Sequence, residues 1–532
     1  MAEMILKLNS PGMTSLHKAG LAGLYMTLRA FNKNEVEIEG LEWKLEKKQI
    51  VLNWTDETPK NAFEKLVKES FRVDEEGFIR LSGLEPRQEM TLEQKHFLYQ
   101  GLLNSFLQFG PHRPTGNKRT LMYKLDQDSE KSIFIKDFAP IKKIRQHETT
   151  TDFIDKNGNF KTDLNVAGWL YPGASQRHVA HAQTTLNESL NLAFTLLFAP
   201  VGVIYYLIRS KAKGRKSRLA LLIPEIKDLE AYAEVRQVIA SQGVIDLTAS
   251  SSSDAALRML IALEANSSSN EFARRMRENF LCRIITFGIV GWNEKQKSRT
   301  STRTVISGKL KGFENYHKAF EIFKNKWQQV KEKRDRNDVI KEPEHFFVTT
   351  FCGREMIADN IANNKSWYHN ISEFLANRET REQLYYEQKE LGQMVNEAEY
   401  EDENVKLFIQ ICHKSWQSRL RKLRKRADEE KLGDDGFFKL IKKEREKLRS
   451  SYARCKNAET LRENVVDFWS RGGSNKLLQG DGLIKVLPLF SEKQWRKAKD
   501  LALLALVSYQ PQNKEENQLL NTEIEIEGED EL

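Results

Sequence analysis

Cysteine is scarce in this sequence, with only four among 532 residues. Cys282, Cys352, Cys412 and Cys455 lie at least 40 residues apart, and no CxxC pair occurs. This spacing argues against a zinc ribbon or a redox motif and suits a reducing cytoplasm. The start, MAEMILKLNSPG, lacks a charged segment followed by a long apolar stretch, so we predict no signal peptide and a cytoplasmic protein.

Motifs of the common catalytic sites are also missing. The segment GNKRT at 116–120 lacks the spaced glycines of a phosphate-binding loop, and neither HExxH nor G-x-S-x-G occurs. His178 and His181 lie three residues apart without a third ligand nearby, which favours surface or supporting roles over a metal site. We therefore predict no catalytic residue, no metal site, no cofactor and no enzymatic activity.

One short pattern keeps a metal-dependent nuclease as an alternative. Glu225 and Lys227 form an ExK sequence at the end of an apolar stretch that predicts a strand. A nuclease of this kind also needs an acidic residue on the preceding strand. The segment 190–224 contains no Asp or Glu, which favours an ordinary strand end.

Positive charge dominates the chain except at its end. Lys and Arg number 84 against 75 Asp and Glu, a net charge of +9. Residues 515–532 contain acidic residues and no basic one, so the preceding part is more basic than this total. A basic body with an acidic tail is a common arrangement in proteins that bind polyanions, because the tail can compete for the basic face. A solvated surface with a disordered tail is the other interpretation.

The one long apolar run is LNLAFTLLFAPVGVIYYLI at 190–208, followed by a basic segment. Its length and the positive charges after it fit a membrane span, so a membrane-anchored protein is a second alternative. Pro200 and Gly202 lie in the middle of the run, however, and Asn191 and Thr195 interrupt it. We favour a helix ending near Phe198, an Ala-Pro-Val-Gly turn and a buried strand.

Hydrophobic periodicity predicts an α+β fold. Short strands and helices alternate in a mixed α/β region, including a helix at 11–31 with small residues for close packing, a hairpin at 36–54, and a helix that a Thr91/Gln94 capping box begins. After residue 366 no proline occurs until Pro488, and helical periodicity predicts a bundle. We predict helices near 372–400, 404–429, 437–457, 458–471 and 491–509, the last with a Ser491/Gln494 capping box. The predicted domains are 1–366, 367–510 and a disordered acidic tail at 511–532.

The strongest functional signal is a basic run on a predicted helix. Residues 405–456 contain 17 Lys and Arg against 7 Asp and Glu. At helical spacing, Phe408, Cys412, Trp416, Leu420 and Leu423 form one apolar stripe, which leaves the basic residues on the remaining surface. Such a surface can follow a phosphate backbone. The candidate contacts are Arg419, Arg421, Lys422, Arg424, Lys425 and Arg426. The alternative is a solvated face paired with the acidic residues at 428–430.

Basic loops in the α/β region form a second candidate surface, because binding residues concentrate on loops. The turn at 110–120 carries residue types that reach base edges, for which phosphate contact or plain solvation is the alternative. The candidates for base contacts, as the reading of a DNA motif would need, are Arg113, Asn117, Lys118 and Arg119. We predict further backbone contacts at Arg177, Lys211, Lys213, Arg215, Lys216, Arg218, Arg299 and Arg303.

Three segments in combination resemble a known family. LHKAGLAGLYMTLRAF near the N-terminus, GWLYPGASQRHVAH at 168–181 and LLFAPVGVIYYLIRS at 196–210 resemble the large subunit of type I CRISPR Cascade effectors, in the type I-B-related branch also described as the myxococcal subtype. The similarity covers most of residues 1–350, and the helical C-terminal third fits by layout. None of the three segments is a catalytic motif, which agrees with a binding role.

The resemblance implies a non-catalytic subunit that reads the protospacer-adjacent motif in duplex DNA, helps to open it and stabilises the R-loop. It implies crRNA, target DNA, the Cascade backbone subunits, the 5′-handle-binding subunit and small-subunit copies as partners, and no membrane. A helicase-nuclease or transposition proteins would be recruited. In type I-B systems the small subunit can be translated from inside the large-subunit gene. Met394, just before the basic part of the bundle, is a candidate internal start.

Overall fold

The chain folds into two compact units. The computed structural model describes residues 2–85, 90–107, 117–125, 131–166, 170–173, 185–209, 217–267, 281–288, 299–306, 310–334, 338, 340–473 and 475–510. The first unit comprises residues 1–210, 216–309 and 325–350, and the second comprises 211–215, 310–324 and 351–532. Strands concentrate in the first unit and helices in the second, which confirms the predicted α+β class. The predicted functional domains stay predictions, and the acidic tail at 511–532 lies outside the described residues.

The first unit begins with a small antiparallel sheet. Its strands β1 (Ala2–Lys7), β3 (Gln49–Trp54) and β2 (Leu41–Leu45) lie in the order β1-β3-β2. The predicted hairpin is the β2–β3 pair, in which Leu45 lies opposite Ile50. Along β3, alternate residues are fully buried, because successive side chains of a strand point to opposite faces.

Helix α1 (Ser15–Lys33) runs through the centre of the first unit, as predicted. Its small residues let another helix approach closely: a Cβ atom on Gly20 would lie 1.9 Å from the carbonyl oxygen of Thr195. From the other side, a Cβ atom on Gly202 would lie 1.7 Å from the carbonyl oxygen of Ala19. Glycine is therefore required on both sides of this contact, since any side chain would collide with backbone.

The apolar run at 190–208 is a folded core segment. It forms α6 (Leu190–Leu197), a helical turn α7 (Ala199–Gly202) and the buried strand β10 (Ile204–Ile208). Within the described ranges, no helix is long and apolar enough to cross a membrane. The prediction of a helix, a turn and a strand is confirmed, and the alternative of a span at 190–208 is wrong because Pro200 and Gly202 divide the run.

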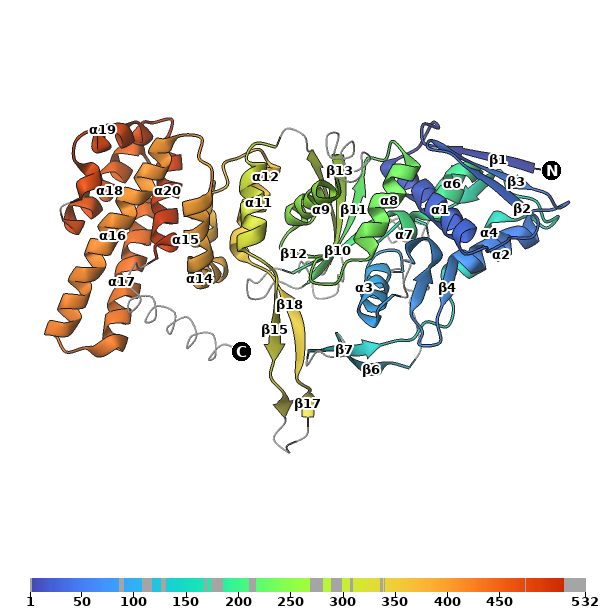
Figure 1. Ribbon diagram of the computed structural model, residues 1–532, viewed down its shortest axis with the longest axis horizontal. Coiled ribbons are helices and arrows are strands. Elements are labelled where there is room, and N and C mark those ends of the chain that lie inside the picture. The colour runs from blue at the N-terminus through green and yellow to red at the C-terminus, as the bar shows by residue number, and fades with distance from the viewer. Residues whose placement is uncertain are drawn as a thin grey trace. The chain divides into compact units, whose positions relative to one another are not determined.

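Strand β10 belongs to the larger sheet of the first unit. The order is β12-β10-β11-β13-β14, with the β10–β12 pair parallel and the other pairs antiparallel. The remaining strands are β11 (Arg218–Pro224), β12 (Thr248–Ala249), β13 (Leu281–Gly288) and β14 (Arg299–Ile306). Helix α9 (Ser252–Ser267) packs against β10, β11 and β13, and helix α8 (Leu229–Ala240) packs against α1. Figure 1 shows this sheet between α9 and α8.

Two-stranded hairpins and short helices complete the first unit. The antiparallel pairs are β4 (Phe71–Val73) with β5 (Ile79–Leu81), β6 (Arg119–Lys124) with β7 (Ser132–Phe138), β8 (Asp163–Asn165) with β9 (Asn187–Ser189), β15 (Lys326–Val330) with β18 (His345–Thr349), and β16 (Lys333–Arg334) with β17 (Ile340–Glu342). The helices are α2 (Lys60–Ser70), α3 (Leu92–Leu103) and α4 (Thr150–Phe153), with 3₁₀ turns at Ser82–Leu84 and Arg145–Glu148. Helix α3 begins with the predicted capping box of Thr91 and Gln94.

The second unit is helical. Its short helices are α11 (Phe313–Ile322), α12 (Cys352–Ala362), α13 (Ile371–Ala376), α14 (Arg378–Tyr386), α15 (Gln388–Glu397) and α19 (Gly482–Val486), with 3₁₀ turns at Lys476–Leu478 and Leu487–Phe490. Its long helices are α16 (Glu403–Glu429), α17 (Gly433–Arg454), α18 (Ala458–Gly472) and α20 (Trp495–Ser508). Helix α16 contacts the other three long helices, and Figure 1 shows the four side by side. The predicted helical bundle is confirmed.

Two local predictions for this unit are wrong. The single helix expected at 372–400 is three helices, because Asn377 is extended and its side-chain oxygen accepts hydrogen bonds from the amides of Glu379 and Thr380 to begin α14. The capping box at Ser491 and Gln494 does not form. The carbonyl of Ser491 accepts the amide of Trp495 instead, and no side chain caps α20.

All four cysteines are free and buried. Burial raises the pKa of the Cys282 and Cys412 thiols to about 12, and it also raises the pKa of Cys455. The thiols therefore serve as small apolar core groups, which agrees with the absence of a metal or redox spacing in the sequence.

Candidate nucleic-acid interface

The predicted motif-reading turn is described only at its end. Arg113 lies outside the described residues, whereas Asn117 and Lys118 are exposed just before β6. Arg119, the first residue of β6, donates a hydrogen bond of 2.8 Å to the carbonyl oxygen of Glu76, and its guanidinium lies 5.4 Å from the ring centre of Phe138. Arg119 is thus held by its own unit, while Asn117 and Lys118 are available to a ligand.

Of the eight backbone contacts predicted on the basic loops, three lie within the described residues. Arg177, Lys211, Lys213, Arg215 and Lys216 lie outside the described residues. Arg218 begins β11, opposite Ile208. Arg299 and Arg303 lie on β14, the last strand of the sheet, opposite Gly288 and Ile284.

Arg218 is one wall residue of a cavity of about 550 Å³ in the first unit. The walls come from α3, β6, β7, β10, β11, β13, β15 and β18. They include the β6–β7 hairpin and the two strands, β10 and β11, that precede and follow the predicted basic contacts at 211–216. Half-buried aromatic rings line it, from Phe97, Phe134, Trp327, His345, Phe346 and Phe347. The polar groups include Arg209, Arg218, Gln100 and Asn104, and no Asp or Glu is among the described residues that line it.

Arg209 is fixed within this cavity by neutral groups. Its NH1 donates to the carbonyl oxygen of Val348 at 3.2 Å, and its guanidinium lies 5.1 Å from the ring centre of Phe347. Its Nε is buried without a hydrogen-bond partner. Burial lowers the pKa of Arg209, although a guanidinium stays charged at neutral pH. Within the described ranges, no carboxylate pairs with Arg209 or Arg218, so these two guanidinium groups have no acidic partner there.

His96 gives the cavity a neutral polar group. Its Nδ1 lies 3.4 Å from the hydroxyl of Tyr123, and its Nε2 lies 3.3 Å from Nε2 of Gln100. Burial lowers the pKa of His96 to about 4. At neutral pH its ring can therefore accept one hydrogen bond and donate one, and the amide of Gln100 and the hydroxyl of Tyr123 are the partners.

The basic run in the second unit lies on α16 as predicted, and its apolar stripe is buried. Ion pairs occupy much of the basic face: Arg419 with Glu444 at 2.8 Å, Arg424 with Asp434 at 2.7 Å, Lys425 with Glu429 at 3.7 Å, and Arg426 with Glu430 at 2.7 Å. Lys422 donates to the carbonyl oxygen of Arg471 at 2.7 Å, whereas Arg421 is exposed and has no partner in the described part of the chain. The local pairing that the sequence offered as the alternative is thus present. The Arg419–Glu444 pair is partly buried, whereas the pairs of Lys425 and Arg426 are exposed. Exposed pairs are worth about 0–1 kcal/mol, so a phosphate can displace the latter two.

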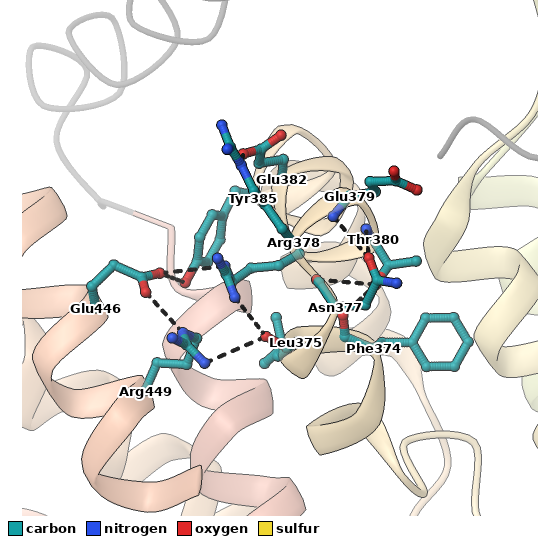
Figure 2. A network of polar contacts seen from close by, with 11 residues as sticks. Phe374, Leu375, Asn377, Arg378, Glu379, Thr380, Glu382, Tyr385, Glu446 and Arg449 are labelled. Atoms are coloured by element: carbon teal, nitrogen blue, oxygen red, sulfur yellow. Dashed lines mark hydrogen bonds and ion pairs between the residues drawn. The ribbon is translucent and has the colours of Figure 1, made fainter. Parts of the chain in front are cut away.

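Helix α17 carries two kinds of basic side chain: some make contacts within the unit, and others are exposed. Figure 2 shows Arg449 between Glu446 and the carbonyl of Leu375, with Tyr385 on the same carboxylate. Arg445 is also used internally, because its guanidinium lies 5.0 Å from the ring centre of Tyr385. These groups fasten α17 to α13 and α14.

A lysine row on α17 was missed from the sequence. Lys439, Lys443 and Lys447 recur every four residues, are exposed and have no ion-pair partner among the described residues. The i, i+4, i+8 spacing was the signal that could have revealed the row. With Arg421 it provides cations that remain unpaired on the two helices.

The residues behind the nuclease alternative do not form a metal site. Glu225 pairs with Lys18, and its backbone amide bonds the carbonyl of Leu281. In the described part of the chain, no group of three or more His, Cys, Asp or Glu side chains could hold a metal ion. His178 and His181 lie outside the described residues.

A strand-rich unit followed by a helical bundle, with basic surfaces on both, is the architecture expected of a CRISPR effector large subunit. The model for the DevT N-terminal domain matches residues 5–197, and the model for the DevT C-terminal domain matches residues 396–531. The "CRISPR-associated protein Cas8a1/Csx13" of Myxococcus xanthus (strain DK1622) is 25% identical over 542 residues, which cover 97% of this chain and 90% of that protein. The chain thus matches both DevT domains and is similar along nearly its whole length to a CRISPR-associated protein, which is consistent with a CRISPR Cascade large subunit.

Proposed function

We propose that the chain is a non-catalytic large subunit that recognises the protospacer-adjacent motif in duplex DNA, helps to open the duplex and stabilises the R-loop. The observation that carries this proposal is the match over 97% of the chain to a CRISPR-associated Cas8a1/Csx13 protein. Its partners are crRNA, target DNA, the backbone and 5′-handle-binding subunits and small-subunit copies. It recruits a helicase-nuclease or transposition proteins.

The two units supply different contacts in this proposal. Asn117 and Lys118 are exposed at the entry to β6, where an amide and an ammonium group can reach base edges. The α16–α17 helices supply phosphate contacts through Arg421 and the exposed lysine row, which carry no sequence information. Motif reading therefore belongs to the first unit, and strand holding belongs to the second.

The test compares two sets of substitutions in the assembled complex. Replacing Arg113, Asn117 and Lys118 with alanine lowers binding to duplexes that carry the motif by at least about tenfold, because a single lost base contact is worth about 1–3 kcal/mol. Replacing Arg421, Arg424 and Lys425 with glutamine weakens the R-loop, reduces the salt dependence and leaves motif preference unchanged. Electrophoretic shifts on matched and motif-scrambled duplexes separate the two effects.

A matched control removes the same charge from a surface with no assigned role. Lys44, Lys47 and Lys48 lie on or beside the β2–β3 hairpin, and their replacement with alanine should leave both readouts unchanged. If neither set of substitutions lowers binding relative to this control, the site assignments are wrong.

Met394 remains a proposed internal start. The DevT C-terminal domain match begins at residue 396, close to the first residue of such a fragment. Met394 is buried in α15, so translation from it would retain only the end of that helix. The fragment would also lack Leu375 and Tyr385, which bond Arg449 and Glu446 in the full chain. In the fragment, the side chains of Arg449 and Glu446 would lose these two contacts and would face solvent or a new partner.

A further inference from the structure

The cavity of the first unit has no role in motif reading or strand holding as proposed above. Its volume of about 550 Å³ lies within the roughly 300–1,000 Å³ of typical ligand pockets. It is too small for a duplex and large enough for an extruded nucleotide. Phe134, Trp327 and Phe347 are half-buried there, so each exposes part of a ring to the cavity. Aromatic faces in this state are stacking platforms for any base.

The charge in the cavity suits one anionic group. Arg209 is positioned by the carbonyl of Val348 and the ring of Phe347, and its Nε still lacks a hydrogen-bond partner. Arg218 lies in the same wall without a carboxylate partner among the described residues. Because the groups that position Arg209 are neutral, they do not compensate its positive charge, which can attract an anionic ligand. A phosphodiester is the anion that accompanies a base.

Neutral polar groups complete the lining. Gln100, Asn104 and Ser217 offer donors and acceptors, and the neutral ring of His96 lies between Tyr123 and Gln100. Amides pair with base edges through two hydrogen bonds. A purely apolar ligand would cover these polar groups without adding a hydrogen bond to any of them, and an acidic peptide would leave the aromatic faces unused.

We propose that this cavity binds an unpaired nucleobase, which stacks on Phe134, Trp327 or Phe347 while its phosphate contacts Arg209 and Arg218. The inference rests on the proposed function, because it takes the ligand to be a strand that the complex already handles. Two sources share this chemistry: the guide RNA and a separated DNA strand. The cavity then holds one nucleotide out of a stack and so fixes the position of that strand on the first unit.

The experiment measures fluorescence anisotropy of the full chain with labelled single-stranded 12-mers of DNA and RNA. Each is compared with an abasic 12-mer that has the same phosphates and no bases. The wild-type chain should bind the complete strand about tenfold more tightly than the abasic strand, since stacking contributes an effect of this size. A variant with Phe134, Trp327 and Phe347 all replaced by leucine should lose this preference, and Arg218→Gln should weaken the binding of both strands. The tighter of the DNA and RNA curves identifies the source.

Matched controls remove the same chemical groups elsewhere. Arg283→Gln changes an exposed arginine of the neighbouring strand β13, and Phe313→Leu changes a half-buried phenylalanine of α11. Both should bind like the wild type. Circular dichroism confirms that each variant is folded, and Arg209→Lys serves as a second cavity variant that keeps the charge but loses the planar contact.

The outcomes separate this inference from the proposed function. If the wild-type chain binds complete and abasic strands equally well, the base site is wrong and the chain contacts only the phosphates of the strand. Binding of motif-bearing duplex with no binding of single strands would overturn the base site. Retention of the base preference in the variant that lacks the three aromatic rings would also overturn it. Loss of motif-dependent duplex binding in the wild-type complex would instead remove the proposed function itself.

Discussion

The contact between α1 and α7 makes Gly202→Ala a sharp test of the first unit. The added methyl group would lie 1.7 Å from the carbonyl oxygen of Ala19 and 3.1 Å from the amide nitrogen of Gly23. The obstacle is helix backbone, which cannot rotate away as a side chain can. Helix α1 would have to move by about 1.5 Å to reach an ordinary contact, although most of its residues are buried.

Overpacking of a core usually costs about 1–3 kcal/mol, and we expect Gly202→Ala to reach the upper end, about 3 kcal/mol. Because a unit of this size has a urea slope of about 3 kcal/mol/M or more, a loss of this size lowers the urea midpoint by up to about 1 M. Hydrogen–deuterium exchange should show faster exchange in peptides from α1 and unchanged exchange in peptides from α16.

Gly243→Ala is the matched control for this substitution. Its methyl group would lie 3.5 Å from Oε1 of Glu93, an ordinary contact, and we expect an effect below about 0.5 kcal/mol. If Gly202→Ala unfolds at the same urea concentration as the wild type, the close approach of α1 and α7 is wrong. A loss of protection in α16 alone would refute the assignment of this contact to the first unit.

Two further predictions concern pH and translation. Burial lowers the pKa of His96 and of His413 to about 4, so the folded chain holds both neutral while the unfolded chain protonates them near pH 6.5. The free energy of unfolding should be highest above about pH 6.5 and should fall towards pH 4, by at most about 1.4 kcal/mol per pH unit for each histidine. In His96→Gln, the urea midpoints measured at pH 7.5, 6 and 5 should differ less than they do in the wild type. For translation, expression with a C-terminal tag should give a fragment of about 16 kDa, by residue count, that Met394→Leu removes; a wild-type blot without that band refutes the internal start.

Local signals were sufficient for several elements of the fold. Pro200 and Gly202 divided the apolar run into a helix, a turn and a strand, and the small residues of α1 indicated close packing. Both are properties of neighbouring residues, which a single sequence contains. The break at Asn377 was missed because its extended backbone interrupts a pattern whose apolar spacing continues through it.

The candidate site was harder to predict because distant segments build it. Trp327 lies opposite Val348 across one hairpin, and the same cavity takes Phe134 from another hairpin and Arg209 from the end of β10. Hydrophobic periodicity relates residues that are close in the sequence, so it cannot reveal contacts between such distant segments. On α16 the sequence located the basic residues, but it could not show that Arg419 pairs with Glu444 of the next helix.

The state of the cysteines has a practical consequence for measuring motion in this protein. With pKa values near 12, the thiols of Cys282 and Cys412 are ionised in only about one molecule in 10⁵ at pH 7, and all four cysteines are buried. A cysteine introduced at an exposed position, such as Val238 at 40% exposure, would thus react with a maleimide dye ahead of the native thiols. Pairs of such dyes could report distances within either unit, without first removing any native cysteine.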